Sequence, residues 1–178
     1  MTDVGDRKKA VDDLLVKIRA AYPDTAFSGS VTRVDGLPDE KLGEEELDEE
    51  KALYHGLRGK RWTDVDGSFV ASNVDGISLL TDDAFTAFLP AWLIAALGNN
   101  NVRELLVYHF SPNLPDDQMS ESTAHQLSER QDRRIRQLTS AQIEALLAFL
   151  TYCFEVETSE FIKRHARKAV DYVTHFRR

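Results

Sequence analysis

Histidine and cysteine side chains are the first candidates for chemistry in this sequence. The histidines are His55, His109, His125, His165 and His175, and none belongs to a His-Glu-x-x-His metal motif. His109 and His165 lie on apolar helix faces, where a hydrogen-bonded core histidine is more usual than a catalytic base. Cys153 lies on a similar face, and a buried thiol without a nearby cation is inert. From these patterns we predict no catalytic residue, no metal ion and no cofactor.

The tripeptide Val-Asp-Gly occurs at residues 34–36, 65–67 and 74–76. The last two copies have the spacing of calcium-binding nonapeptide arrays, but the double glycine and the further repeats of such arrays are missing. The segment from Asp64 also begins like an EF-hand loop, yet its glycine comes too early and Asp75 stands where the loop needs Glu. We interpret all three copies as turns, because Asp-Gly favours turns.

The densest charge in the sequence is the acidic segment 39–50, with eight acids in twelve residues. One interpretation is a solvated helix face. The other is a surface that attracts a basic protein partner by electrostatic steering. The candidate partner-binding residues of this surface are Glu44, Glu45, Glu46, Asp48, Glu49 and Glu50. The basic regions 130–136 and 163–168 either neutralise this segment within the molecule or bind a phosphate-bearing ligand.

The length and charge of the chain limit its class. A chain of 178 residues is long enough for one domain with a sizeable core. Its net charge of −8 argues against nucleic acid and anionic membranes as partners, because both attract cationic surfaces. No apolar run reaches the roughly 20 residues that a bilayer crossing needs, and the polar N-terminus lacks the apolar core of a signal peptide. We therefore expect a cytoplasmic protein.

The most hydrophobic stretch, residues 79–98, is expected to organise the rest of the fold. Its large apolar residues have helical spacing and alanines fill much of the opposite side, which is typical of a buried helix. Thr81 is the expected N-cap, and Pro90 predicts either a kink or a new helix start. The predicted core anchors are Trp62, Phe85, Phe88, Pro90 and Trp92.

Further helices are predicted on both sides of this stretch from apolar spacing and capping residues. They span residues 6–22, 44–57 and 102–110, with a basic helix at 130–138, then a helix that opens at Thr139 and has apolar residues through Phe154, and a helix capped by Thr158 or Ser159 that runs to about residue 176. The last two should form an antiparallel hairpin because their link is short, with Phe161 and His165 facing inward. The polar segment 111–128 is predicted to be a mobile loop.

These elements predict an all-α fold. We expect a single domain over residues 1–178, a bundle of five to six helices around the central buried helix. Residues 24–36 and 60–80 are expected to form either a small β patch or irregular structure, because glycines and turn dipeptides interrupt the apolar spacing there.

Three motifs stand out along the chain. They are Gly59-Lys60-x-Trp62, Ala84-Phe85-x-x-Phe88-Leu89-Pro90-Ala91-Trp92, and Leu138-Thr139-x-x-Gln142 before an apolar helix. Together they resemble an uncharacterised family of small bacterial proteins, a domain of unknown function. The resemblance covers about residues 6–155 and leaves out residues 156–178. It implies no activity, because its motif residues are of structural types.

Three functions follow as hypotheses. The first is a binding protein, most concretely an immunity or antitoxin-like protein that masks a basic toxin through the acidic segment. The second, an alternative, is a hydrolytic or metal-dependent enzyme with dispersed candidate residues His109, His165, Asp82, Asp83 and Trp62. The third is a helical scaffold or regulator that acts as a homodimer through an exposed apolar face of the last helix. An enzyme is less favoured than a binding protein because no catalytic set is visible.

Overall fold

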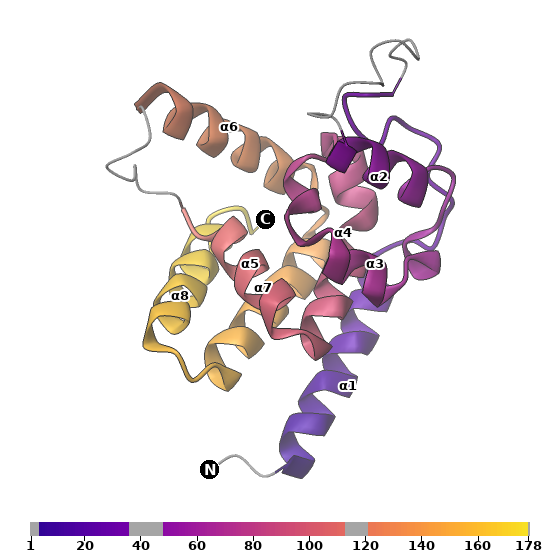
Figure 1. Ribbon diagram of the computed structural model, residues 1–178. Helices are drawn as coiled ribbons and strands as arrows, with labels where there is room; N and C mark the ends of the chain where they lie inside the picture. The colour runs from indigo at the N-terminus through magenta and orange to yellow at the C-terminus, as the bar shows by residue number, and fades with distance from the viewer. Residues whose placement is uncertain (1–3, 36–47, 113–120, 178) are drawn as a thin grey trace. The chain divides into compact units, whose positions relative to one another are not determined.

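The computed structural model describes residues 4–35, 48–112 and 121–177. These residues form eight α-helices and two short 3-10 helices and contain no strand (Figure 1). The helices are α1 Val4–Ala21, α2 Asp48–Leu57, α3 Gly67–Ser72, α4 Asp82–Gly98, α5 Asn100–Phe110, α6 Glu121–Gln137, α7 Ser140–Val156 and α8 Glu160–Thr174, with the 3-10 helices η3 Trp62–Asp64 and η4 Val74–Ser78. The all-α prediction is confirmed. Residues 60–80 are helical turns and loops, so the β alternative does not hold there.

The chain divides into two compact units. Unit 1 comprises Met1–Ala21 and Leu106–Arg178, and unit 2 comprises Tyr22–Leu105. Helix α5 contributes its first six residues to unit 2 and the remainder to unit 1. Each unit has its own buried helix, α4 in unit 2 and α7 in unit 1.

Helix α4 is the centre of unit 2, as the hydrophobic stretch predicts. The Thr81 hydroxyl accepts a hydrogen bond from the Ala84 N–H at 3.2 Å and so caps the helix as expected. The helix continues through Pro90 to Gly98 without restarting. Proline removes only one backbone hydrogen bond, and burial of the apolar side chains on both sides of it keeps the helix intact.

The predicted core anchors are all buried in unit 2. Helix α3 and both 3-10 helices pack on α4. The Trp62 indole donates a hydrogen bond to the Pro23 carbonyl at 3.2 Å, and the Trp92 indole donates one to the Val74 carbonyl at 3.4 Å. The two indoles therefore hold the irregular segments to the helical core. The buried anchors are Trp62, Phe85, Phe88, Pro90 and Trp92.

Helix α7 is the centre of unit 1 and packs against α1 and α8 (Figure 1). Thr139 and Gln142 form the predicted capping box: each side chain bonds the backbone N–H of the other, at 3.3 and 2.9 Å. Ser159 caps α8, and the short link between α7 and α8 produces the predicted hairpin. The Arg177 guanidinium binds both carboxylate oxygens of Glu144 and holds the end of the chain to α7.

Two predictions for the C-terminal half differ from the structure. The inward orientation of Phe161 is wrong, because its side chain is 54% exposed. The buried residues of α8 are Ala166, Ala169 and Val173, so the inward stripe is narrower than the apolar pattern suggested. Helix α6 begins at Glu121 and therefore includes residues 121–128 of the predicted loop, while residues 113–120 lie outside the described part of the chain.

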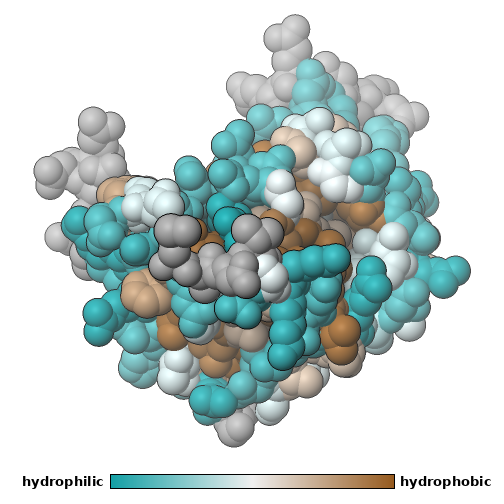
Figure 2. Space-filling model, turned by 90° about the horizontal axis from the view of Figure 1, so that it is seen from below, coloured by the Kyte–Doolittle hydropathy of each residue, from teal (hydrophilic) through white to brown (hydrophobic). Residues whose placement is uncertain are grey.

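The described helices show no membrane-crossing segment: none combines the necessary length with the necessary hydrophobicity. On the face drawn in Figure 2, hydrophobic side chains are visible between hydrophilic ones. The large hydrophobic residues exposed among the described residues are Val16, Tyr108, Leu127, Phe154 and Phe161.

Candidate functional site

The negative charge of the chain is concentrated in unit 2. This unit contains sixteen Asp and Glu residues against seven Lys and Arg, a formal charge of −9, whereas unit 1 has a formal charge of +1. Some acids of unit 2 are neutralised by neighbours, as in the pairs Arg33–Glu50, Lys51–Asp48 and Arg61–Asp24. The excess of acids over bases in this unit creates a negative field that attracts cations.

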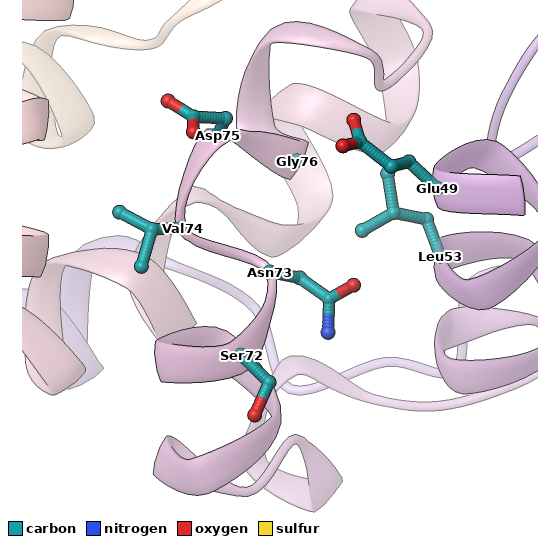
Figure 3. A pocket seen from close by; sticks show the side chains of 7 residues that line it. All are labelled: Glu49, Leu53, Ser72, Asn73, Val74, Asp75 and Gly76. Carbon is teal, nitrogen blue, oxygen red and sulfur yellow. The ribbon is translucent and has the colours of Figure 1, made fainter. Parts of the chain in front are cut away.

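A pocket in unit 2 collects two of the unneutralised carboxylates. It is a cavity of about 90 Å³ between α2 and the segment that joins α3 to η4 (Figure 3). Its wall consists of Glu49, Leu53, Ser72, Asn73, Val74, Asp75 and Gly76. The side chains of Glu49 and Asp75 are exposed, and neither carboxylate forms an ion pair or hydrogen bond with a described residue.

Local sequence explains how this wall forms. Asp66 caps α3 by accepting a hydrogen bond from the Ser68 N–H at 2.8 Å. The helix ends at Asn73, whose side-chain amide donates to the Phe69 carbonyl at 2.8 Å. The following Val-Asp-Gly copy, 74–76, forms the first turn of η4, in agreement with its interpretation as a turn. The end of α3 and the start of η4 therefore contribute Asn73 and Asp75 to the wall of the same pocket, and in Figure 3 the two side chains point to different sides of the backbone.

Gly76 allows α2 and η4 to approach each other at the pocket. A Cβ atom at this position would lie 2.7 Å from Leu53 Cδ2, closer than real Cβ contacts come. Gly76 and Leu53 are both buried, so their contact forms the floor between the two elements. A larger residue at position 76 would push α2 away from the carboxylate of Asp75.

The pocket has the chemistry of a receptor for an organic cation. Carboxylates bind guanidinium and ammonium groups through charge-assisted hydrogen bonds. The part of the chain that the structure describes includes no group of three or more His, Cys, Asp or Glu side chains that could hold a metal ion. The small volume suits the end of one Lys or Arg side chain rather than a large ligand.

The structure separates the six acids of the predicted partner-binding surface. Asp48 and Glu49 are exposed, whereas Glu44, Glu45 and Glu46 lie outside the described residues. Glu50 is only 4% exposed, because it faces the core and pairs with the Arg33 guanidinium at 2.6 Å. Its Oε2 atom is buried and accepts no hydrogen bond from the described residues. Glu50 is therefore part of the core and not of a solvent-facing surface.

The two candidate histidines of the enzyme hypothesis lie in unit 1, whereas Asp82, Asp83 and Trp62 lie in unit 2. The Nε2 atom of His109 is buried; burial and the charges of Arg134 and Arg130 lower the pKa of this histidine to about 3. A histidine with that pKa is neutral at physiological pH. Its backbone carbonyl accepts a hydrogen bond from the side-chain amide of Gln131.

His165 contacts a serine hydroxyl. Its Nδ1 atom lies 3.0 Å from Ser111 Oγ, which is the distance between a nucleophile and its base in many hydrolases. Ser111, however, is only 2% exposed and lies at the end of α5, where its N–H bonds the Val107 and Tyr108 carbonyls. This arrangement connects α8 to the end of α5 and leaves the hydroxyl out of reach of a substrate.

Three residues of the pocket escaped sequence reasoning. Ser72, Asn73 and Asp75 belong to no periodic pattern, and the tripeptide that includes Asp75 indicated only a turn. The turn at residues 73–76 lies beside α2 only in the folded chain, and no sequence pattern within either segment indicates that they are neighbours.

Comparisons with known proteins give one match. No curated protein and no solved structure shows significant similarity to this chain. A family model does match, over residues 10–176, and so extends through all of α8, past the end expected from the motifs. This agrees with the resemblance to an uncharacterised family noted from the sequence. The chain belongs to the family of unknown function DUF6714.

Proposed function

We propose that this chain is a small bacterial cytoplasmic binding protein whose acidic unit 2 receives a basic segment of a partner protein. One Lys or Arg side chain of the partner would enter the pocket between Glu49 and Asp75. The observation that carries the proposal is the pair of unneutralised carboxylates, contributed by two different elements, at one cavity of the more charged unit.

The charge of unit 2 supports fast and selective association with such a partner. A formal charge of −9 accelerates the encounter with a cationic surface and repels acidic competitors. An ion pair in a partly enclosed pocket is less screened than one on an open surface. A basic toxin that the chain masks, as an immunity or antitoxin-like protein does, fits this chemistry.

The test is purification of the tagged full-length chain from its native host, with mass spectrometry of the proteins that accompany it. We expect one stoichiometric basic protein with the wild type. The double variant Glu49→Gln/Asp75→Asn should retain it about tenfold or more less well, because both carboxylates of the pocket are neutralised. Added salt should weaken the wild-type complex.

The matched control is Asp83→Asn/Glu104→Gln. Asp83 and Glu104 are also exposed acids of unit 2 without an ion pair to a described residue, and the control changes the net charge by the same amount. The control should keep the partner. Equal loss in both double variants, or a partner that binds the pocket variant as well as the wild type, would reject the pocket as the receptor.

A further inference from the structure

Unit 1 carries an exposed cluster of aromatic rings. Tyr108 on α5 is 52% exposed and Phe161 on α8 is 54% exposed. The ring of His165 contacts both of them, with centroid distances of 5.3 Å to Tyr108 and 4.5 Å to Phe161. Three rings from two helices thus form a continuous surface, and all three belong to unit 1. Large exposed apolar side chains that touch one another are typical of binding surfaces.

Two cations flank these rings. Phe161, Arg164, His165 and Lys168 have the spacing i, i+3, i+4, i+7 and therefore share one face of α8. Neither Arg164 nor Lys168 forms an ion pair with a described residue. By contrast, Lys163 pairs with Glu160 at 3.3 Å. Tyr108, Phe161, Arg164, His165 and Lys168 are called the aromatic–cationic face below.

The aromatic–cationic face is held in place before any partner arrives. The hydrogen bond between His165 and Ser111 fixes the central ring. Ser111 in turn bonds the Tyr108 carbonyl through its N–H, so the two helices are connected at the middle of the cluster. Arg164 and Lys168 are one residue before and three residues after His165 on α8, and their positive charges, after burial, are the causes that lower the pKa of this histidine. A preorganised surface loses little side-chain entropy on binding.

We propose that the aromatic–cationic face binds an acidic peptide segment of a partner protein, one in which aromatic side chains alternate with Asp or Glu. The aromatic side chains would cover Tyr108 and Phe161, and the carboxylates would pair with Arg164 and Lys168. The charge of this face is opposite to that of the pocket in unit 2, so the proposal does not depend on the proposed function.

Two observations favour a peptide over single-stranded nucleic acid. The Tyr108 and Phe161 rings are tilted by 45° and 54° from the ring of His165, so the cluster lacks parallel platforms on which successive bases stack. The chain as a whole also carries a net charge of −8, which disfavours a long polyanion more than a short acidic segment. An acidic peptide needs only the local cations of α8.

The test measures fluorescence anisotropy of a labelled synthetic peptide, in which Glu alternates with Phe, as the full-length chain is added. We expect saturable binding, weakened about tenfold or more by Phe161→Ala and by the double variant Arg164→Gln/Lys168→Gln. Because these side chains are at the surface, far-UV circular dichroism of the variants should match the wild type. The wild-type chain should bind a peptide with Ser in place of Phe as weakly as the Phe161→Ala variant binds the Phe-containing peptide.

The control variants change unit 1 outside this face. Phe154→Ala removes another exposed phenylalanine, and Arg7→Gln removes another exposed cation. Both should leave the affinity unchanged. Equal weakening by the controls, no binding up to about 1 mM peptide, or tighter binding of a labelled oligothymidylate of the same length would overturn the proposal. The peptide proposal would also be overturned if the chain forms a homodimer that Phe161→Ala or Arg164→Gln/Lys168→Gln dissociates, because a second copy of the chain would then occupy the aromatic–cationic face.

Discussion

Gly76 and Leu53 meet so closely that a methyl group on Gly76 would lie 2.7 Å from Leu53 Cδ2. This contact sets the separation of η4 from α2 and thus the width of the pocket between Asp75 and Glu49. Gly56 on the same helix is a second close approach, because a Cβ there would overlap the ring of Phe69 on α3. Two glycines therefore allow α2 to pack closely against its neighbours: Gly76 on η4 faces Leu53 of α2, and Gly56 on α2 faces Phe69 of α3.

Gly76→Ala is expected to destabilise the protein by about 1–3 kcal/mol, because the added methyl group forces Leu53 or the backbone to move. Urea unfolding of the full-length chain measures this loss. Gly98→Ala is the control, since a Cβ at Gly98 meets nothing within 4 Å, and it should be neutral or slightly stabilising. The addition of Leu53→Ala to Gly76→Ala should cost less than Leu53→Ala costs alone. Additive costs would show that the two residues are not in contact.

Arg33→Ala is expected to cost about 1–3 kcal/mol, more than the loss of an ordinary surface ion pair, because it leaves the buried Glu50 carboxylate without its cation. Its side chain is 73% exposed, so solvent compensates part of the loss. Glu50→Gln in the Arg33→Ala background should restore stability, since a neutral amide tolerates burial better than an unpaired charge. Denaturant titration of the four-member cycle measures the coupling. No coupling between the two positions would contradict the buried placement of Glu50.

The free energy of unfolding should decrease as the pH falls below about 6.5, in part through His109. The pKa of this histidine is about 3 in the folded protein, against 6.5 ordinarily, so in this window the unfolded state binds a proton that the folded state does not. The stabilisation that comes from the lowered pKa of His109 is fully present above pH 6.5 and is lost as the pH falls toward 3. Its slope is at most about 1.4 kcal/mol per pH unit, and less to the extent that the ring is partly exposed.

His109→Gln should therefore flatten the pH dependence between about pH 5 and 7 in urea titrations, whatever its effect on stability at neutral pH. His55→Gln removes an exposed imidazole and is the matched control for the loss of a histidine. A slope in His109→Gln equal to that of the wild type would mean that His109 is accessible to protons in the folded protein.

Lys168→Gln should raise the pKa of His165. Burial lowers this pKa most, and the charge of Lys168 is the next cause, so its removal lessens the repulsion of the imidazolium. An NMR titration of the His165 ring signals measures the change directly. Arg167→Gln, on the same helix but not among the causes of the shift, should change the pKa less. The opposite order would place Arg167, and not Lys168, beside the ring.

The helix caps show how much of the fold short stretches of sequence determine. Thr81, Thr139 and Ser159 each accept a hydrogen bond from an N–H three residues further on, as their positions before apolar runs predict. The buried helices α4 and α7 follow from apolar spacing over their own length. The all-α class is the sum of such local choices.

Neighbouring residues in one acidic run show the limit of this reasoning. Glu49 and Glu50 are alike in sequence, yet one borders a pocket and the other is buried beside Arg33. Phe161 has the spacing of a core residue, yet the narrow stripe of Ala166, Ala169 and Val173 is buried instead. In both cases the outcome depends on which distant segment packs against the helix.

The sequence by itself determined the helices, their caps, the central position of residues 82–98 and the family. The helices and their caps depend on hydrogen bonds and apolar spacing within a few turns, and the family is indicated by short motifs. Tertiary structure alone decided the pocket of Glu49 and Asp75 and the exposed rings of Tyr108 and Phe161. Each of these sites joins segments that are far apart in the chain, and the packing that brings them together is a property of the folded core and not of either segment.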